Sequence, residues 1–92
     1  MAGRITDIDQ ARTAVERKAW SEAYESFLVL EPSGLTPDDW DGYADAAWWT
    51  GRIGESIAAR QKAYTGYAEA GDDRRAAGMA ARLCIEHFVR DE

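Results

Sequence analysis

One spacing of apolar residues occurs in two segments, and it constrains the fold more than any other feature of the chain. In both segments the residues fall at relative positions 0, 3, 4, 7 and 8, the pattern of one face of an α-helix. The first segment carries Trp20, Ala23, Tyr24, Phe27 and Leu28, and the second carries Trp40, Tyr43, Ala44, Ala47 and Trp48. Because no segment favours a strand, the sequence predicts an all-α protein.

Breakers and caps divide the chain into five predicted helices. Pro32 interrupts the chain, and Thr36 and Asp39 form a predicted capping box for a helix with Pro37 in its first turn. Helices joined by turns of about two to six residues pack as antiparallel neighbours. We therefore predict one domain over residues 1–92, with helices over 7–18, 20–30, 37–50, 54–70 and 73–90.

The last two predicted helices have less regular apolar stripes, and these stripes should face the core. In the helix over 54–70 the stripe consists of Ile57, Tyr64, Tyr67 and Ala68. In the helix over 73–90 the residues expected to be buried are Ala76, Ala77, Ala80, Leu83, Cys84 and Phe88.

The helical segments also match one another in pairs. The turn over 18–23 matches the turn over 51–56 at an offset of 33 residues, since each has an apolar residue, any residue, Glu and a small residue after the turn. Trp40-x₂-Tyr43-Ala44-x₂-Ala47 resembles the first-helix signature of a tetratricopeptide repeat, and Ala23-x₃-Phe27 resembles its second-helix element. The resemblance implies two and a half helix–turn–helix repeats in a right-handed array. Ser56-x₃-Arg60 departs from the second-helix pattern.

A longer segment resembles a narrower group of proteins. Residues 43–83 read YADAAWWTGRIGESIAARQKAYTGYAEAGDDRRAAGMAARL. This phrase is similar to the tetratricopeptide-like segments of actinobacterial LuxR-type transcriptional regulators and adenylate-cyclase-like regulators. The resemblance implies a sensory or oligomerising module that belongs to, or is related to, a bacterial regulator. Neither the DNA-binding helix-turn-helix of those proteins nor the cyclase catalytic residues occur in this sequence.

Charge is unevenly distributed along the chain. The formal net charge is −6, and residues 19–51 contain seven acidic residues with no Lys or Arg. Such a balance disfavours a nucleic acid as a direct partner, because phosphate binding requires clustered basic residues. It favours a protein or basic peptide, and the alternative is a solvated acidic face that serves solubility alone. No apolar run of about 18 residues and no leader pattern occurs, so a cytoplasmic protein without a membrane segment is expected.

No set of residues in the sequence predicts catalysis. The sequence lacks the nucleophile elbow, the phosphate-binding loop and the HExxH zinc motif. Cys84 and His87 are three residues apart on one predicted helix, but two ligands are too few for a metal site. We therefore expect no enzyme activity, no cofactor and no metal.

The strongest candidate for partner binding is a stripe on the helix over 37–50. Its members, beside the apolar stripe, are Asp38, Asp41, Asp45 and the adjacent pair Trp48 and Trp49. Carboxylates next to an indole suit a cationic ligand. Trp48 continues the apolar stripe and is expected to pack, whereas Trp49 points about 100° away and is expected to face a groove or a partner.

The last helix is a candidate for self-association. It has apolar residues on more than one face, namely Leu83, Ile85, Phe88 and Val89. A second copy of the chain is one way to cover them, which would give a homodimer. The sequence therefore predicts a protein-interaction or oligomerisation module, and the alternative is a sensor that binds an organic cation or apolar effector in a Trp-lined groove.

Overall fold

A computed structural model describes residues 7–30 and 32–91, and most of these lie in five α-helices. Because these two ranges contain no strand, the predicted all-α class is confirmed. Within the same ranges, no helix has the length and apolar character needed to cross a membrane. The helices are α1 (Asp7–Glu16), α2 (Trp20–Leu28), α3 (Pro37–Trp49), α4 (Ile53–Glu69) and α5 (Asp73–Arg90), and a 3₁₀ helix η1 (Pro32–Gly34) precedes α3.

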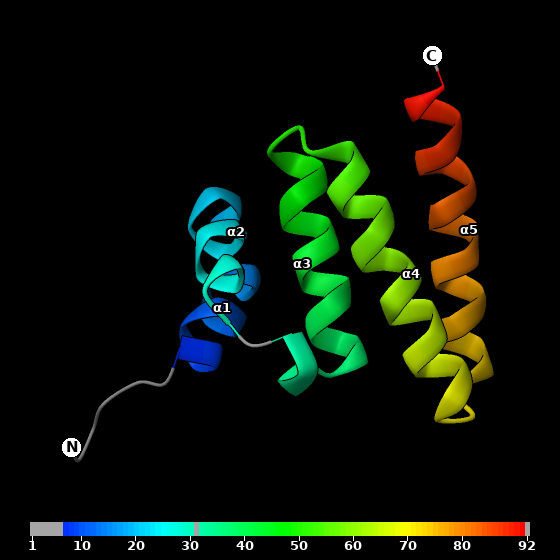
Figure 1. Cartoon of the computed structure of the whole chain (residues 1–92), viewed down its shortest axis with the longest axis horizontal. Helices are drawn as coiled ribbons and strands as arrows, with labels where there is room; N and C mark the ends of the chain where they lie inside the picture. Colours follow the sequence, from blue (N-terminus) through cyan, green and yellow to red (C-terminus); the bar gives the residue numbers. More distant parts are fainter. Residues whose placement is uncertain (1–6, 31, 92) are drawn as a thin grey trace.

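The helices follow one another across the molecule, with α1 and α2 at one end and α5 at the other (Figure 1). The chain reverses direction between α3 and α4 and again between α4 and α5. Helix α4 packs against both of its neighbours, whereas α3 and α5 are not packed directly on one another in the described chain. Side chains that connect α3 with α5 therefore have to reach across the side of α4.

The two turns that match in sequence also share one backbone geometry. Lys18 and Gly51 stand at equivalent positions, and both adopt positive φ, 59° and 83°. In each turn the N–H of this residue donates to the carbonyl three residues earlier, at 3.0 and 3.1 Å. The next N–H donates to the carbonyl five residues earlier, at 2.9 and 2.7 Å. This is the Schellman end of a helix, and α4 ends in the same way at Gly71, with φ 79°.

The start of α3 has the predicted cap. Thr36 Oγ1 accepts from the Asp39 N–H at 3.1 Å, and the Thr36 N–H donates to Asp39 Oδ2 at 3.0 Å. Pro37 occupies the first turn, where a missing N–H costs nothing. The capping box is therefore confirmed.

The apolar core has two parts, one on each side of α3. Between α1, α2 and α3, the ring of Phe27 stacks on that of Tyr43 with centroids 5.2 Å apart. The fully or nearly fully buried residues around them are Ala14, Ala23, Tyr24, Ala46 and Ala47. On the other side, α4 and α5 bury Ala63, Tyr67 and Ala76 against Trp40 and Met79.

The stripe predicted for α4 is only half correct, and the one for α5 is largely wrong. Ile57 and Tyr67 are buried, but Tyr64 and Ala68 are exposed. In α5 the fully buried residue is Glu86, which pairs with Arg60 of α4. A buried charge needs its partner, and this pairing turns the apolar stripe of α5 toward solvent. Of the six residues predicted to be buried there, Ala76 is buried, Leu83 is half-buried, and Ala77, Ala80, Cys84 and Phe88 are exposed.

Candidate functional site

A buried guanidinium joins the three C-terminal helices. The side chain of Arg60, on α4, has no exposed surface. Its Nη1 lies 2.5 Å from Asp41 Oδ1, and its Nη2 lies 3.0 Å from Asp45 Oδ1, both on α3. The same Nη2 lies 2.8 Å from Glu86 Oε2 on α5. Arg60 therefore connects α3 to α5, which do not pack on each other directly.

Two further side chains complete this cluster, which we call the Arg60 cluster. Arg82 of α5 places its Nη2 3.4 Å from Glu86 Oε2 and 3.8 Å from Asp45 Oδ1. Ser56 Oγ lies 3.3 Å from Glu86 Oε1. Three carboxylates and two guanidiniums leave one net negative charge.

The electrostatics of the cluster favour a charged Arg60. Burial acts to lower the pKa of Arg60, but the hydrogen bond to Glu86 and the surrounding carboxylates raise it above its usual value. Burial and the nearby charge of Asp45 raise the pKa of Asp41, and they outweigh the opposing effect of Arg60. These groups pair with one another, and their role is to hold α3, α4 and α5 together.

Two of the aspartates predicted to bind a partner are thus already paired inside the protein. Asp41 and Asp45 keep about a third of their side-chain surface, 33% and 30%. Asp38 accepts a hydrogen bond from the Tyr67 hydroxyl, and burial together with this bond raises the pKa of Tyr67. The interaction of this stripe with a cationic partner stays a prediction.

The adjacent tryptophans separate as their spacing predicts. Trp48 is half-buried, and Trp49, at the end of α3, is 63% exposed. Trp49 is therefore available for contact with another molecule.

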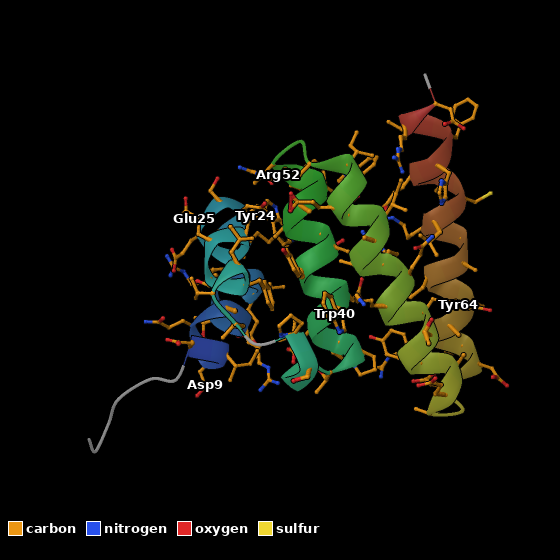
Figure 2. The ribbon with its side chains drawn as sticks, viewed as in Figure 1. Asp9, Tyr24, Glu25, Trp40, Arg52 and Tyr64 are labelled. Carbon is orange, nitrogen blue, oxygen red and sulfur yellow. The ribbon has the colours of Figure 1, made fainter. Side chains whose placement is uncertain are left out.

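Aspartate and tyrosine side chains make two further polar contacts between helices. Arg12 of α1 forms a bidentate pair with Asp39 of α3, with both N···O distances 2.8 Å. Tyr24 and Arg52 lie close together beside the turn from α3 to α4 (Figure 2), with the guanidinium carbon 4.0 Å from the ring centroid. The Tyr24 hydroxyl donates to Glu55 Oε1 at 2.6 Å. Polar contacts therefore occur on both sides of α3.

A groove with a volume of about 690 Å³ lies between α4 and the segment that leads into α3. Trp40 forms part of its wall, and the Lys62 ammonium lies 5.4 Å from the centroid of the Trp40 ring. Gly66 allows the two walls to meet, because a Cβ there would lie 2.6 Å from Pro37 Cγ. The other lining residues are Pro32, Ser33, Leu35, Ala58, Gln61, Thr65 and Glu69.

The side of α5 that faces away from α4 is apolar and exposed. Phe88 is 70% exposed and Ile85 is 54% exposed, while Leu83 and Val89 are half-buried. A contiguous exposed apolar patch is a candidate interaction site, whereas single exposed apolar residues are normal. We define the α5 outer face by its exposed members, Ala77, Gly78, Ala80, Ala81, Cys84, Ile85 and Phe88.

The 33-residue repeat explains why this face is unusual. Ala77 and Ala80 of α5 are equivalent to Ala44 and Ala47 of α3. In α3 both alanines have no exposed surface, because α4 and α2 pack around that helix. In α5 both are exposed. Within the described residues, α5 thus has a helix-packing face that no helix covers.

Sequence reasoning missed Arg60 and Glu86, the centre of the Arg60 cluster. The departure of Ser56-x₃-Arg60 from the repeat pattern was the available signal, because Arg60 is equivalent to the core residue Phe27. A charged residue at a core position requires buried partners of opposite charge. The identity of those partners depends on the rotation of α5, which the sequence does not determine.

The described residues contain no group of three or more His, Cys, Asp or Glu side chains arranged to hold a metal ion. The features that remain for function are the α5 outer face, the Trp40 groove and the exposed Trp49. Comparisons of the chain with protein-family models, with curated proteins and with solved structures found no match.

Proposed function

We propose that this chain is a non-enzymatic protein-interaction or oligomerisation module that receives a partner helix on the α5 outer face. One observation carries the proposal: Ala77 and Ala80 are exposed, whereas the equivalent Ala44 and Ala47 lie buried among packed helices. A face built for helix packing and left open is suited to a helix from another molecule. The likeness of residues 43–83 to segments of bacterial regulators supports a place in a regulatory protein.

The acidic stripe on α3 supports a partner less well than α5 does. A basic peptide would have to compete with Arg60, which already pairs with Asp41 and Asp45 at 2.5 and 3.0 Å. Drawing these carboxylates away would leave the fully buried guanidinium of Arg60 with fewer compensating charges, which is unfavourable. A basic partner at Trp49 and the exposed edges of these carboxylates is therefore a weaker proposal than an apolar helix on α5.

Site-specific photo-crosslinking tests the function. A photoreactive amino acid is placed at Ala81 on the α5 outer face, and in a matched variant at Ala68, which is exposed on α4. We expect one discrete adduct from position 81 in cells that produce the protein, and none of that mass from position 68. The adduct from position 81 should disappear when Phe88 is replaced by Glu, because a buried carboxylate prevents helix docking.

The result that contradicts the function is equally specific. Equal labelling from positions 81 and 68, or no discrete adduct from either, would show that the α5 outer face has no preferred partner. An adduct from position 81 that persists in the Phe88→Glu variant would place the contact elsewhere.

The Trp40 groove supports a second candidate function, a sensor of small ligands. Its wall combines the indole of Trp40 with Leu35 and Pro37, which suits an apolar aromatic effector. An organic cation is disfavoured, because the Lys62 ammonium already lies 5.4 Å from the Trp40 ring. Titration with indole and with tryptamine, followed by the NMR signal of the Trp40 indole N–H, tests this candidate. Indole should shift the signal more than tryptamine, and equal or absent shifts would dismiss the sensor.

A further inference from the structure

The α5 outer face matches a second copy of itself in shape. Ala77, Ala81, Cys84 and Phe88 recur at relative positions 0, 4, 7 and 11, the spacing of a seam between two helices. The N-terminal part of the face contains only small residues, whereas the C-terminal part carries the large side chains of Ile85 and Phe88. If two such helices run in opposite directions, the large side chains of each lie over the small residues of the other.

The charge of this face also suits a second copy. The chain has a net charge of −6, whereas the seven residues of the α5 outer face are uncharged, and the exposed charged residues of α5 lie near its two ends, at Asp73, Arg74, Arg75 and Arg90. Two copies can therefore meet there without bringing carboxylates together, although most other surfaces of the protein would repel a second copy.

We propose that two copies of the chain pair through their α5 outer faces, in opposite directions, about a two-fold axis that passes between Ala81 and Cys84. Phe88 of each copy packs over Ala77 of the partner subunit, and Ile85 packs near Gly78 of the partner subunit. The partner helix in the proposed function is then α5 itself. This inference rests on the proposed function and identifies the partner helix as α5 of a second copy of the chain.

The arrangement places the two Cys84 residues near the axis. With small residues in the seam, the helix axes approach to about 8 Å, and Cys84 lies about one and a half residues from the axis, so the two Cα atoms come within about 6 Å. Cα atoms at this separation allow a disulfide. Cys84 is exposed, so an added oxidant reaches it in the monomer as well.

Two measurements on the full chain test the dimer. The first is the mass by light scattering between about 5 and about 500 µM, a range that covers weak association through one helix pair. We expect the mass to rise toward twice the monomer mass of 10.2 kDa. Ala81→Glu should abolish the rise, because it places two carboxylates beside the axis, and the matched variant Ala68→Glu on the exposed surface of α4 should leave it unchanged.

The second measurement is disulfide cross-linking with diamide, which takes up the two electrons and two protons that the thiols lose. The natural chain, whose thiol is Cys84, is compared with a matched variant that carries Ala68→Cys together with Cys84→Ser. We expect the natural chain to form the covalent dimer at least about tenfold faster, because the proposed pairing holds its two thiols together before oxidation. Circular dichroism of the same samples checks that both proteins keep their helical signal.

A monomeric mass at every concentration overturns the dimer, as does a dimer that persists in Ala81→Glu or equal cross-linking rates at the two positions. These outcomes differ from failure of the proposed function. If the purified chain is monomeric but position 81 still gives an adduct of a different mass in cells, the second copy is excluded and another helix occupies the face. If position 81 gives no adduct and the chain is monomeric, both proposals fail.

Discussion

Phe27 and Arg60 occupy the same position in the 33-residue repeat, and the protein fills that position in opposite ways. Phe27 is 3% exposed and stacks on Tyr43 with an angle of 10° between the rings. Arg60 has no exposed surface and is surrounded by three carboxylates. The preceding positions of the repeat, Ala23 and Ser56, are both fully buried. Burial thus follows the repeat, while the chemistry of the buried residue does not.

The difference teaches what each half of the protein requires of its neighbours. An aromatic ring packs against any apolar surface of suitable shape, so Phe27 taken alone constrains the orientation of α3 only loosely. A buried guanidinium needs carboxylates at fixed distances, so Arg60 determines which face of α5 turns inward. Glu86 takes an inward position beside Ala76 and Met79, and the large apolar side chains of Ile85 and Phe88 face solvent. The α5 outer face is therefore a consequence of the choice of Arg at position 60.

The largest effect is expected from Arg60→Met. This variant leaves Glu86 buried without its main cation, and loss of one partner of a buried ion pair costs about 3 to 5 kcal/mol. Urea unfolding followed by circular dichroism should show this loss. The exposed Arg90→Met is the matched control and should change stability by less than about 0.5 kcal/mol.

Replacing Glu86 as well sharpens this test. In Arg60→Met, Glu86→Met no buried charge is left unpaired at the centre, since Asp41 and Asp45 keep contact with water. Most of the lost stability should return. If the double variant is less stable than Arg60→Met, the Arg60 cluster does not work as a set of mutually compensating charges.

The second largest effect is expected from Phe27→Ala, at about 3 kcal/mol, because it opens a cavity beside Tyr43. This loss should be the same at pH 4 and pH 7, because the ring of Tyr43, on which Phe27 stacks, is uncharged at both pH values. Phe27→Leu, which keeps most of the volume, should cost less than about 1.5 kcal/mol. A loss for Phe27→Ala that varies with pH would contradict the distinction between the two halves.

The parts of the fold that depend on local signals could be predicted from the sequence. The helices, the capping box at Thr36 and the turn at Gly51 follow from spacing, side-chain caps and residues that tolerate positive φ. The rotation of α5 could not be predicted, because apolar spacing favours Phe88 inside and only the long-range pairing of Glu86 with Arg60 decides otherwise. Helical spacing correctly places Asp41 and Asp45 on one stripe, but their internal partner depends on the same packing.

Asp39→Asn is expected to have a moderate effect of about 1 kcal/mol, because it weakens the cap of α3 and the pair with Arg12. Burial acts to raise the pKa of Asp39, but hydrogen bonds from Arg12 and Thr36 hold it below its ordinary value. The ionised Asp39 therefore stabilises the fold above the unfolded pKa, and this contribution is lost as the pH falls through the folded pKa. At pH 7 the free energy of unfolding of Asp39→Asn should be clearly lower than that of the natural protein, and at about pH 3 this difference should be smaller. A difference that grows on acidification would contradict this.

Asp41→Asn is expected to have the smallest effect and to change the free energy of unfolding by less than about 0.5 kcal/mol at pH 7. This small effect is expected even though Asp41 Oδ1 lies 2.5 Å from Arg60 Nη1. Burial and the charge of Asp45 raise the pKa of Asp41 in the folded protein, so ionisation of Asp41 opposes folding. The stability that protonated Asp41 provides is therefore lost as the pH rises through its folded pKa. The amide resembles the protonated form and still accepts from Arg60. A loss above about 2 kcal/mol at pH 7 would mean that the Asp41 charge stabilises the Arg60 cluster, as a broken buried pair would. A near-neutral result makes Asp41→Asn a folded variant in which binding of a basic peptide to the α3 stripe can be measured directly.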